Sequence, residues 1–354
     1  MSGHNPTRAV RDSEALDLVR LQPWLVANAG WQGTVRVSQF AGGASNLTYL
    51  LEGDDGQALV LRRAPPGRKA KGAHDMAREF ALQAALAGAY PVPRGVALCQ
   101  DEEVVGTEFY VMARVEGTIL RGRLPDGMVL APADARRLCE AFVAQLVALH
   151  RQRPADRPEL APFGKPEGYV RRQLEGWIAR YDAAKTWNVP SWKDVTTWLL
   201  AHRPDDVDRV LVHNDFRFDN LVLDPDDPSR VTAVLDWELA TIGDPWMDLG
   251  NVLAYWVQAD DDAIAQQMRR QPTHLPGMMT RTELVQAYAD ASGRPLPDMR
   301  FYQVFGLFRL AVILQQIYWR YAKGQTKNPS FRWFWAFNAY LWWRARRVLA
   351  GREA

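Results

Sequence analysis

A polar run between two apolar segments carries the residue types that phosphoryl transfer requires. The run is His213-Asn214-Asp215-Phe216-Arg217-Phe218-Asp219-Asn220, and Asp236 follows sixteen residues after its end. A carboxylate can orient an attacking hydroxyl and accept its proton, and carboxylate or amide oxygens are the ligands that Mg²⁺ prefers. In this interpretation Asp215 faces the acceptor, Asn220 turns back towards a metal ion, and Asp236 is the second metal ligand.

The segments around this run support the catalytic interpretation. Apolar residues 210–212 and 221–223 bracket it, and VTAVLDWE places Asp236 at the distance of a β-hairpin. The alternative is that Asp215 and Asn220 only form turns and that Asp236 ends a strand. That alternative gives no reason for three metal-compatible groups to cluster between buried strands.

Two further residues of the run have predicted roles. We expect His213 to brace the loop through hydrogen bonds rather than to transfer protons. Arg217 lies two residues beyond the predicted base, where a cation could stabilise the oxygens of the phosphoryl group during transfer. A solvated loop arginine is the alternative, and the sequence leaves both open.

The remaining sequence divides into two groups of elements that position this run. Short β-branched or apolar segments predict strands in the first third, and helical spacing dominates from Pro132 onward. The predicted strands are residues 34–40, 46–53, 57–64, 94–100 and 107–115, with a strand-rich island at 210–236; the predicted helices are residues 13–28, 74–88, 132–150, 166–185, 190–202, 281–292, 296–323 and 329–350. This order predicts an α+β fold, with a small β-rich part followed by a larger helical part.

The bulk composition restricts the class of protein. At 354 residues the chain suits two lobes better than one small core. The net charge of +2, from 43 basic and 41 acidic residues, argues against nucleic-acid binding. The only cysteines, Cys99 and Cys139, form no CxxC pair, which fits a cytoplasmic protein. The apolar stretch 301–319 contains an arginine and three amides, so we expect a buried helix there and no membrane span.

The segments HNDFRFDN and LDWELATIGDPWMDLG resemble the aminoglycoside phosphotransferase and choline kinase-like family of the protein-kinase-like superfamily. The similarity is closest to the phosphotransferase domain associated with acyl-CoA dehydrogenases, and it extends from GGASNLTYLL through FYVMARVEG to FRLAVILQQIYWRY. It implies a two-lobed kinase-like fold, with a nucleotide-binding lobe at residues 1–115 and a helical lobe, catalytic and acceptor-binding, at residues 116–354.

The resemblance also implies roles for individual residues. Asp215 is the implied catalytic base, Asn220 and Asp236 are the implied Mg²⁺ ligands, and ATP is the implied phosphoryl donor. Asp248 is expected to anchor the catalytic loop from the start of a helix. Asp244, just before Pro245, has the position of an N-cap.

The nucleotide-binding half has weaker motifs. Gly42, Gly43, Ser45 and Asn46 lie between two predicted strands, where a glycine-rich loop would cover phosphates with backbone N–H groups, although a plain hairpin turn competes with this interpretation. Arg62 replaces the lysine of the kinase V-A-I-K pattern and remains able to bind phosphate.

Two more elements complete the predicted nucleotide site. The helix after Arg62 offers Glu79 as its ion-pair partner, with a solvated helix charge as the alternative. Backbone groups of Ala113 to Val115 are expected to bond the adenine edge, and Met112 to line its apolar slot.

The acceptor is expected to be a small molecule with a hydroxyl group. Arginine and aromatic residues on two late helices suit an anionic hydroxy-acid or a hydroxyacyl thioester; the residues singled out are Arg172, Trp177, Arg309 and Tyr318. Periodicity alone cannot orient these arginines, so a solvent-facing placement is the alternative.

Other functions remain open at this stage. An aminoglycoside phosphotransferase is one alternative, and a non-catalytic nucleotide-binding module is another, because Arg62 and the imperfect glycine loop hint at decay. A protein kinase ranks third, since no activation segment follows LDWE. The sequence sets neither the acceptor's identity, nor the preference for ATP over GTP, nor the oligomeric state.

Overall fold

The computed structural model describes residues 7–40, 46–65, 75–165 and 167–352. The chain forms two compact units, one of Met1–Ile119 with Asn220–Leu239 and one of Leu120–Asp219 with Ala240–Ala354. The division into lobes at residues 1–115 and 116–354 stays a prediction, and the compact units differ from it by grouping residues 116–119 and 220–239 with the N-terminal strands.

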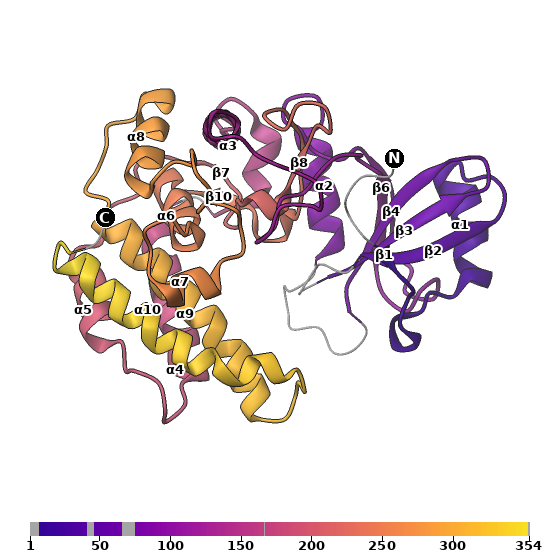
Figure 1. Ribbon diagram of the computed structural model, residues 1–354. Coiled ribbons are helices and arrows are strands. Elements are labelled where there is room, and N and C mark those ends of the chain that lie inside the picture. The colour runs from indigo at the N-terminus through magenta and orange to yellow at the C-terminus, as the bar shows by residue number, and fades with distance from the viewer. Residues whose placement is uncertain (1–6, 41–45, 66–74, 166, 353–354) are drawn as a thin grey trace. The chain divides into compact units, whose positions relative to one another are not determined.

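The N-terminal unit is built on a six-stranded antiparallel sheet with the strand order β1-β2-β3-β4-β6-β5 (Figure 1). The strands are β1 (Thr7–Arg8), β2 (Val35–Phe40), β3 (Leu47–Gly53), β4 (Ala58–Arg63), β5 (Gly95–Cys99) and β6 (Phe109–Ala113). The strands predicted at residues 34–40, 46–53 and 57–64 are confirmed as β2, β3 and β4, which form an antiparallel meander, and the two later predicted strands are β5 and β6. The short β1 was not predicted.

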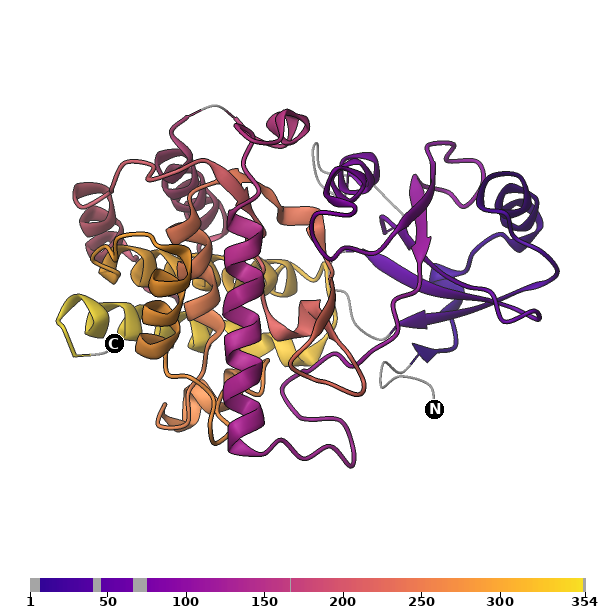
Figure 2. The same ribbon diagram turned by 90° about the horizontal axis from the view of Figure 1, so that it is seen from above.

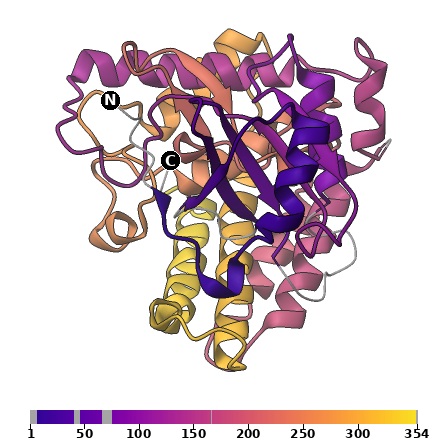
Figure 3. The ribbon, with the colours of Figure 1, turned by 90° about the vertical axis from the view of Figure 1, so that its right-hand side faces the viewer.

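Two helices cover opposite faces of this sheet. Helix α1 (Leu18–Ala29), capped by the Asp17 side chain, packs with Leu59, Leu61, Phe109 and Val111, and Figure 3 shows it on the viewer's side of the sheet. Helix α2 (Met76–Leu86) packs with Val60, Tyr110 and Met112. Side chains alternate between the two faces of a strand, so Arg62 lies on the α2 face and Arg63 on the α1 face.

A β-hairpin from later in the chain completes this unit. Strands β8 (Leu221–Leu223) and β9 (Val231–Val234) pair with each other, and Thr118 forms a bridge with Leu223. Gly117 has φ +153°, and a Cβ there would lie 2.4 Å from the carbonyl oxygen of Leu223, so this crossing requires glycine. The hairpin predicted from VTAVLDWE is therefore present.

The second unit is mainly helical, and Figure 2 shows α3 as its long magenta helix. Its helices are α3 (Pro132–His150), α4 (Tyr169–Ala184), α5 (Lys193–Ala201), α6 (Pro245–Tyr255), α7 (Ala263–Met268), α8 (Arg281–Ser292), α9 (Arg300–Ala322) and α10 (Phe334–Leu349). Six of them correspond to predicted helices, α6 begins after Asp244 as that residue's expected N-cap position implied, and α7 was not predicted. Strand β7 (Val210–Val212) pairs with β10 (Thr241–Gly243), which was also unexpected.

Helix α9 is the centre of this unit. It packs against α4, α6 and α10, and α10 runs beside it in Figures 1 and 3. The crossing with α6 depends on two glycines, since a Cβ on Gly306 would lie 2.2 Å from the carbonyl oxygen of Gly250. Within the described residues, no helix has the length and apolar character needed to cross a membrane, and the stretch expected to be buried lies in α9.

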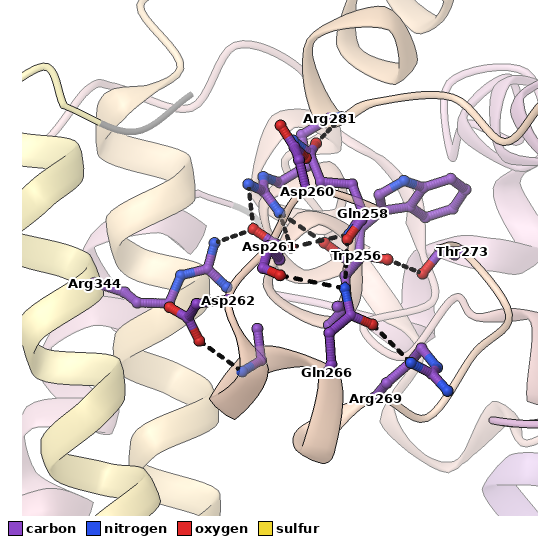
Figure 4. Close-up of polar contacts among 12 residues, drawn as sticks. Trp256, Gln258, Asp260, Asp261, Asp262, Gln266, Arg269, Thr273, Arg281 and Arg344 are labelled. Atoms are coloured by element: carbon purple, nitrogen blue, oxygen red, sulfur yellow. Dashed lines mark hydrogen bonds and ion pairs between the residues drawn. The ribbon is translucent and has the colours of Figure 1, made fainter. Parts of the chain in front are cut away.

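A buried ionic cluster joins the end of α6 to α8 and α10 (Figure 4). Asp261 accepts hydrogen bonds from both terminal nitrogens of Arg281, at 2.7 and 3.0 Å, and one of 3.3 Å from Arg344. Gln258 accepts from the backbone N–H of Arg281. These bonds tie the segment after α6 to two helices that are distant in sequence.

Candidate active site

The predicted catalytic loop begins directly after β7, and two phenylalanines fix its course. Phe216 and Phe218 are fully buried against Phe142 of α3, and Phe218 also contacts Trp256. The backbone N–H of Phe218 donates a 2.8 Å hydrogen bond to Gln271. With the aromatic side chains directed into the core, the alternate residues Asp215, Arg217 and Asp219 remain partly accessible.

Arg217 lies between the two aspartates of this loop. Its Nη2 atom donates a 3.0 Å hydrogen bond to Oδ2 of Asp215, its Nε atom lies 2.9 Å from Oδ1, and it also pairs with Asp219 at 3.3 Å. Its guanidinium packs on the ring of Tyr255, 4.6 Å from the centroid. Arg217 is thus held in place by named partners, which excludes the alternative of a solvated loop arginine.

Charges in this group shift the pKa values of its members. Burial raises the pKa of Asp219, the neighbouring charge of Asp215 raises it further, and Arg217 only partly offsets both. The pKa of Arg217 lies above its usual range, because Asp215 and Asp219 outweigh the effect of its burial. The guanidinium is therefore a fixed positive charge beside the predicted base. Tyr255 was not predicted, because nothing in its sequence context marks it.

Asp248 holds the start of the catalytic loop from the first turn of α6. Its carboxylate accepts the backbone N–H groups of His213, at 2.8 Å, and Asn214, at 2.7 Å. Asp244 caps the same helix by accepting the N–H groups of Trp246 and Met247. The expected contact between Asp248 and the loop, and the expected N-cap, are both present.

The loop contains a residue in an uncommon backbone conformation. Asn214 has φ +64°, in the left-handed region that non-glycine residues rarely adopt. Its side-chain oxygen accepts hydrogen bonds from Tyr169, at 2.9 Å, and Asn251, at 3.2 Å. The Nδ1 atom of His213 accepts the N–H of Asp215 at 3.3 Å, as expected for a bracing residue. Such conformations persist where the surrounding structure holds them in place, and they cluster at functional sites.

A second layer supports Asp248 from the interior of the unit. Nε2 of His150 lies 3.2 Å from Oδ2 of Asp248, and Nδ1 lies 2.7 Å from the hydroxyl of Tyr288. A carboxylate only accepts, so Nε2 carries the proton and Nδ1 accepts from Tyr288. Burial lowers the pKa of His150 and keeps it neutral, whereas hydrogen bonds from His150 and the loop backbone outweigh burial and hold the pKa of Asp248 below its usual range.

The two predicted metal ligands lie at one end of the β8–β9 hairpin. Asn220 precedes β8, Asp236 follows β9, and Leu221 is paired with Val234 between them. The N–H of Leu235 donates a 2.8 Å hydrogen bond to the carbonyl oxygen of Asn220. Asp236 is the second site residue in the left-handed region, with φ +66°.

The donor set at this end of the hairpin suits one kind of ion. An amide oxygen and a carboxylate match Mg²⁺, which takes few protein ligands and completes its shell with water and phosphate oxygens. Among the described residues, no three His, Cys, Asp or Glu side chains form a group that could hold a metal ion.

Arg62 connects Asp236 to helix α2. It donates a 3.1 Å hydrogen bond to the buried carboxylate of Glu79 and a second, short one to Asp236. The predicted ion pair between Arg62 and Glu79 is confirmed, and Glu79 is not a solvated helix charge. Burial raises the pKa of Glu79, and Arg62 offsets this in part.

Glu238 is a member of this group that the sequence did not suggest. Its carboxylate lies 3.6 Å from Arg62 and accepts a 2.8 Å hydrogen bond from the side chain of Asn46, which is buried. Its position two residues after Asp236 was the one available signal. Of the predicted phosphate-loop residues, Gly42, Gly43 and Ser45 lie outside the described residues, and Asn46 lies within them.

The residues expected at the adenine edge follow β6. Met112 is buried and packs with Val60 and Met76 on the α2 face of the sheet. The N–H of Ala113 is bonded to the carbonyl of Arg94 at 2.8 Å, so it is not available to adenine. Val115 contacts the small cluster of Ile119, Val222 and Ala233.

The four residues expected at the acceptor site are not all brought together. Arg309 of α9 is 4% exposed and packs over the ring of Trp177 of α4, 5.2 Å from its centroid. Tyr318 instead accepts a 3.0 Å hydrogen bond from Asn188, and nine residues after Arg309 it lies on roughly the opposite face of α9. Arg172 is half-buried, over one turn before Trp177. Arg309 is therefore not solvent-facing. Of the other three residues, only Trp177 is in contact with it.

A strand-rich N-terminal unit and a mainly helical unit that carries the loop at residues 213–220 are the features of the protein-kinase-like two-lobed fold. A sequence model described as the phosphotransferase enzyme family matches residues 36–285, most of the chain. The chain belongs to this family.

Relatives of known name place the chain more closely. It is 35% identical over 324 residues to acyl-CoA dehydrogenase family member 11 of Homo sapiens, covering 90% of this chain and 40% of that protein. It is 36% identical over 329 residues to acyl-CoA dehydrogenase family member 10 of Mus musculus, covering 92% and 30%. The chain thus spans well under half the length of these relatives.

Solved structures share the fold. The crystal structure of a candidate aminoglycoside phosphotransferase from Ralstonia eutropha has a TM-score of 0.76 at 31% identity, covering 94% of this chain and 99% of that one. An aminoglycoside phosphotransferase in complex with AMP-PNP and hygromycin B has a TM-score of 0.59 at 15% identity, covering 94% and 99%. Choline kinase from Cryptosporidium parvum has a TM-score of 0.60 at 10% identity, covering 90% of both chains. The last two similarities concern the fold alone.

Proposed function

We propose that this chain transfers the γ-phosphoryl group of ATP to a hydroxyl group of a small molecule, in a reaction that requires Mg²⁺. Membership of the phosphotransferase enzyme family supports the reaction class. The observation that carries the proposal is the loop of Asp215 and Arg217, a carboxylate with a fixed cation, held at its start by Asp248. Phosphoryl transfer needs this combination of an orienting carboxylate and positive charge.

In the proposed reaction Asp215 accepts the proton of the acceptor hydroxyl as its oxygen forms a bond to the γ-phosphorus. The bond between that phosphorus and the β–γ bridging oxygen breaks, and ADP leaves. Arg217 orients Asp215 through its two contacts and offers positive charge to the oxygens in transfer. Asp219, whose pKa is raised by burial, lies on the other side of Arg217 and is not assigned a catalytic role.

Asn220 and Asp236 would hold the Mg²⁺ ion. When bound, the ion neutralises charge on the phosphate oxygens. The left-handed backbone of Asp236 and its pairing with Arg62 support this assignment, since both fix the carboxylate at the end of the hairpin.

The proposed nucleotide site uses residues of the strand-rich unit. Arg62, fixed by Glu79, would bind phosphate in place of the usual lysine. Asn46, Gly42, Gly43 and Ser45 are proposed at the phosphate loop. We place the side chain of Met112 and the backbone of Val115 against the adenine ring. Ala113 would contribute its carbonyl oxygen only, because its N–H is already bonded to the carbonyl of Arg94.

The proposed acceptor is an anionic hydroxy-acid or a hydroxyacyl thioester. Two observations support it over an aminoglycoside, which is a polycation: the relatives named as acyl-CoA dehydrogenase family members, and a buried arginine, Arg309, in the helical unit. The hygromycin B-bound aminoglycoside phosphotransferase and choline kinase are similar in fold only, whereas the candidate aminoglycoside phosphotransferase of Ralstonia eutropha is 31% identical, which keeps the aminoglycoside as the alternative acceptor. A cytoplasmic location stays a prediction.

The test is transfer of labelled phosphate from ATP to hydroxy-fatty acids, their coenzyme A esters and kanamycin-like sugars, with and without Mg²⁺. Asp215→Asn should lower turnover by about 1,000-fold or more, since general base catalysis contributes 10²–10⁴-fold. Asp226→Asn, an exposed aspartate of the β8–β9 turn, is the matched control and should behave as wild type. Equal turnover in wild type and Asp215→Asn would instead indicate a non-catalytic nucleotide-binding module, and preference for the sugar would reject the anionic acceptor.

A further inference from the structure

Arg309 is a buried cation without a counter-charge among the residues that the structure describes. It is 4% exposed, on a helix face that packs into the core of the helical unit. Within the described ranges it makes no hydrogen bond or ion pair, and its one specific contact is with the ring of Trp177. Burying an ionised group without a partner is costly, so such a group calls for an explanation.

Other buried polar groups of the same unit show how unusual this is. Arg281 and Arg344, buried to a similar extent, both pair with Asp261. Arg62 and Arg63 of the strand-rich unit have partners as well. Among the buried arginines that the structure describes, Arg309 is therefore the exception.

The surroundings of Arg309 place it near the catalytic loop of its own unit. Helix α9 crosses α6 at Gly306, where a Cβ would lie 3.3 Å from the Cβ of Ala254, the residue before Tyr255. Arg309 lies one turn after Gly306 on α9, and Arg217 of the catalytic loop packs on the ring of Tyr255, 4.6 Å from its centroid. Burial raises the pKa of Tyr255, and the charges of Arg217 and Arg309 partly offset this. The indole of Trp177, on which Arg309 packs, is itself only half-buried.

We propose that Arg309 binds an oxyanion of the phosphoryl acceptor, with Trp177 packed against the bound guanidinium, and so determines specificity for anionic acceptors; this inference rests on the proposed phosphotransferase function. A guanidinium offers two parallel N–H donors to a carboxylate or phosphate. The acceptor's hydroxyl meets Asp215, and its anionic group meets Arg309 across Tyr255. The oxyanion is a carboxylate in a free hydroxy-acid and a phosphate in a coenzyme A thioester.

The chain offers a matched control on the same ring. Arg180 packs on Trp177 at 4.7 Å from the centroid, but it is exposed. Arg180→Met therefore removes a cation from this indole without removing the buried charge, whereas Arg309→Met removes the buried charge and keeps similar length. Arg309→Lys keeps the positive charge and loses the two parallel N–H donors of the guanidinium.

The substrates in the test are hydroxydecanoate, hydroxydecanoyl coenzyme A and decanediol. In Arg309→Met we expect kcat/KM for one of the two anionic compounds, relative to that for decanediol, to fall by about 100-fold, the effect of losing a charge-assisted hydrogen bond. Arg309→Lys should recover part of this ratio, and Arg180→Met should change it by less than about 3-fold. The anionic compound that responds identifies the group that Arg309 binds.

Stability of the protein without ligand separates a binding role from a packing role. Removing an unpaired buried charge should leave the Tm of Arg309→Met equal to or above that of wild type. A lower Tm together with equal losses for all three substrates would show a structural cation held by Trp177 and overturn the proposal. A wild-type protein that prefers neither anion to decanediol would overturn it as well.

Calorimetric titration without ATP makes the two proposals separable. Tighter binding of hydroxydecanoate or its thioester than of decanediol, lost in Arg309→Met, supports the role of Arg309 even if no phosphate transfer occurs. Phosphate transfer that depends on Asp215 but shows no such difference in binding supports the proposed reaction and rejects the role of Arg309.

Discussion

The backbone N–H of Leu235 donates a 2.8 Å hydrogen bond to the carbonyl oxygen of Asn220. This bond continues the pairing of β8 with β9 by one step, so the hairpin holds the residue before one strand beside the residues after the other. Asn220 and Asp236, sixteen residues apart, are thereby fixed at one end of a single rigid element. If β8 and β9 pair in the correct register, both proposed metal ligands are placed at the same end of the hairpin.

The first prediction concerns metal dependence. Asp236→Asn should reduce kcat/KM for MgATP by about 100-fold or more, because an ion that contributes several kcal/mol to the transition state loses its charged ligand. Turnover measured against Mg²⁺ concentration should also show a higher half-saturation. Asp224→Asn, in the turn of the same hairpin, is the control. An unchanged Mg²⁺ requirement in Asp236→Asn would remove this residue from the metal site.

The second prediction separates two adjacent arginines of β4. Arg62 pairs with Glu79 and Asp236, whereas Arg63 on the other face donates to the hydroxyl of Tyr49 and to the carbonyl of Val105 at 2.7 Å. Arg62→Met should lower kcat/KM for MgATP by about 100-fold, since two charge-assisted contacts are lost. Arg62→Lys should retain much of the activity, because the positive charge remains.

Arg63→Met is the matched control for this prediction. It leaves buried acceptors without a donor, so the free energy of unfolding should fall by about 3 kcal/mol, while the KM for MgATP of the folded protein stays near that of wild type. Denaturant titration and steady-state kinetics on both variants provide the comparison. If Arg63→Met raised the KM and Arg62→Met did not, the assignment of the two faces would be reversed.

Sequence patterns predicted the elements that have one clear periodicity. Residues 132–150 and 281–292 show helical spacing between a starting and a stopping signal, and both helices begin and end as predicted. The position of Arg62 in the kinase V-A-I-K pattern, together with the helix that follows, also predicted its pairing with Glu79. Only the start of α6 was predicted, from Asp244 and Pro245, because nine of its eleven residues are buried, which leaves no polar stripe to reveal a period.

The remaining site features depend on long-range contacts. Asn214, in its left-handed conformation, is bonded to Asp248 and Asn251, which lie far along the chain, so no local pattern predicts this conformation. Glu238 acquires its role only when the hairpin packs beside β4. On α9, apolar residues surround Arg309 on every side of the helix, and periodicity could not show that this arginine is buried.

The third prediction is a pH dependence of stability. Burial lowers the pKa of His150 in the folded protein below its usual 6.5, while in the unfolded chain it stays near that value. As pH falls below 6.5, the unfolded state binds a proton that the folded state does not, so stability decreases. Between about pH 7 and pH 5 this group should lower the free energy of unfolding as the pH falls, with a slope of at most about 1.4 kcal/mol per pH unit.

His150→Gln provides the comparison, since its amide can donate to Asp248 without titrating. The free energy of unfolding of this variant should fall less steeply over the same range. The other charged groups near His150, namely Asp248, Asp208 and Arg294, are unchanged in the variant and contribute equally to both curves. Parallel curves for wild type and His150→Gln would show that His150 is not buried in its neutral form.

The fourth prediction concerns the cluster in Figure 4, in which Asp261 is the shared partner of Arg281 and Arg344. Asp261→Asn leaves two buried guanidinium groups without their carboxylate, which should lower the free energy of unfolding by about 3 to 5 kcal/mol. Asp260→Asn changes the adjacent, exposed aspartate and should alter stability by about 0.5 kcal/mol or less. Urea denaturation of both variants measures the difference. Asp261 lies in the segment that follows α6 and contacts neither Asp215 nor Arg309, so its substitution should leave the kcat of the folded protein unchanged. Equal stability of Asp261→Asn and Asp260→Asn would contradict the prediction, because it would mean that other partners are sufficient to hold Arg281 and Arg344.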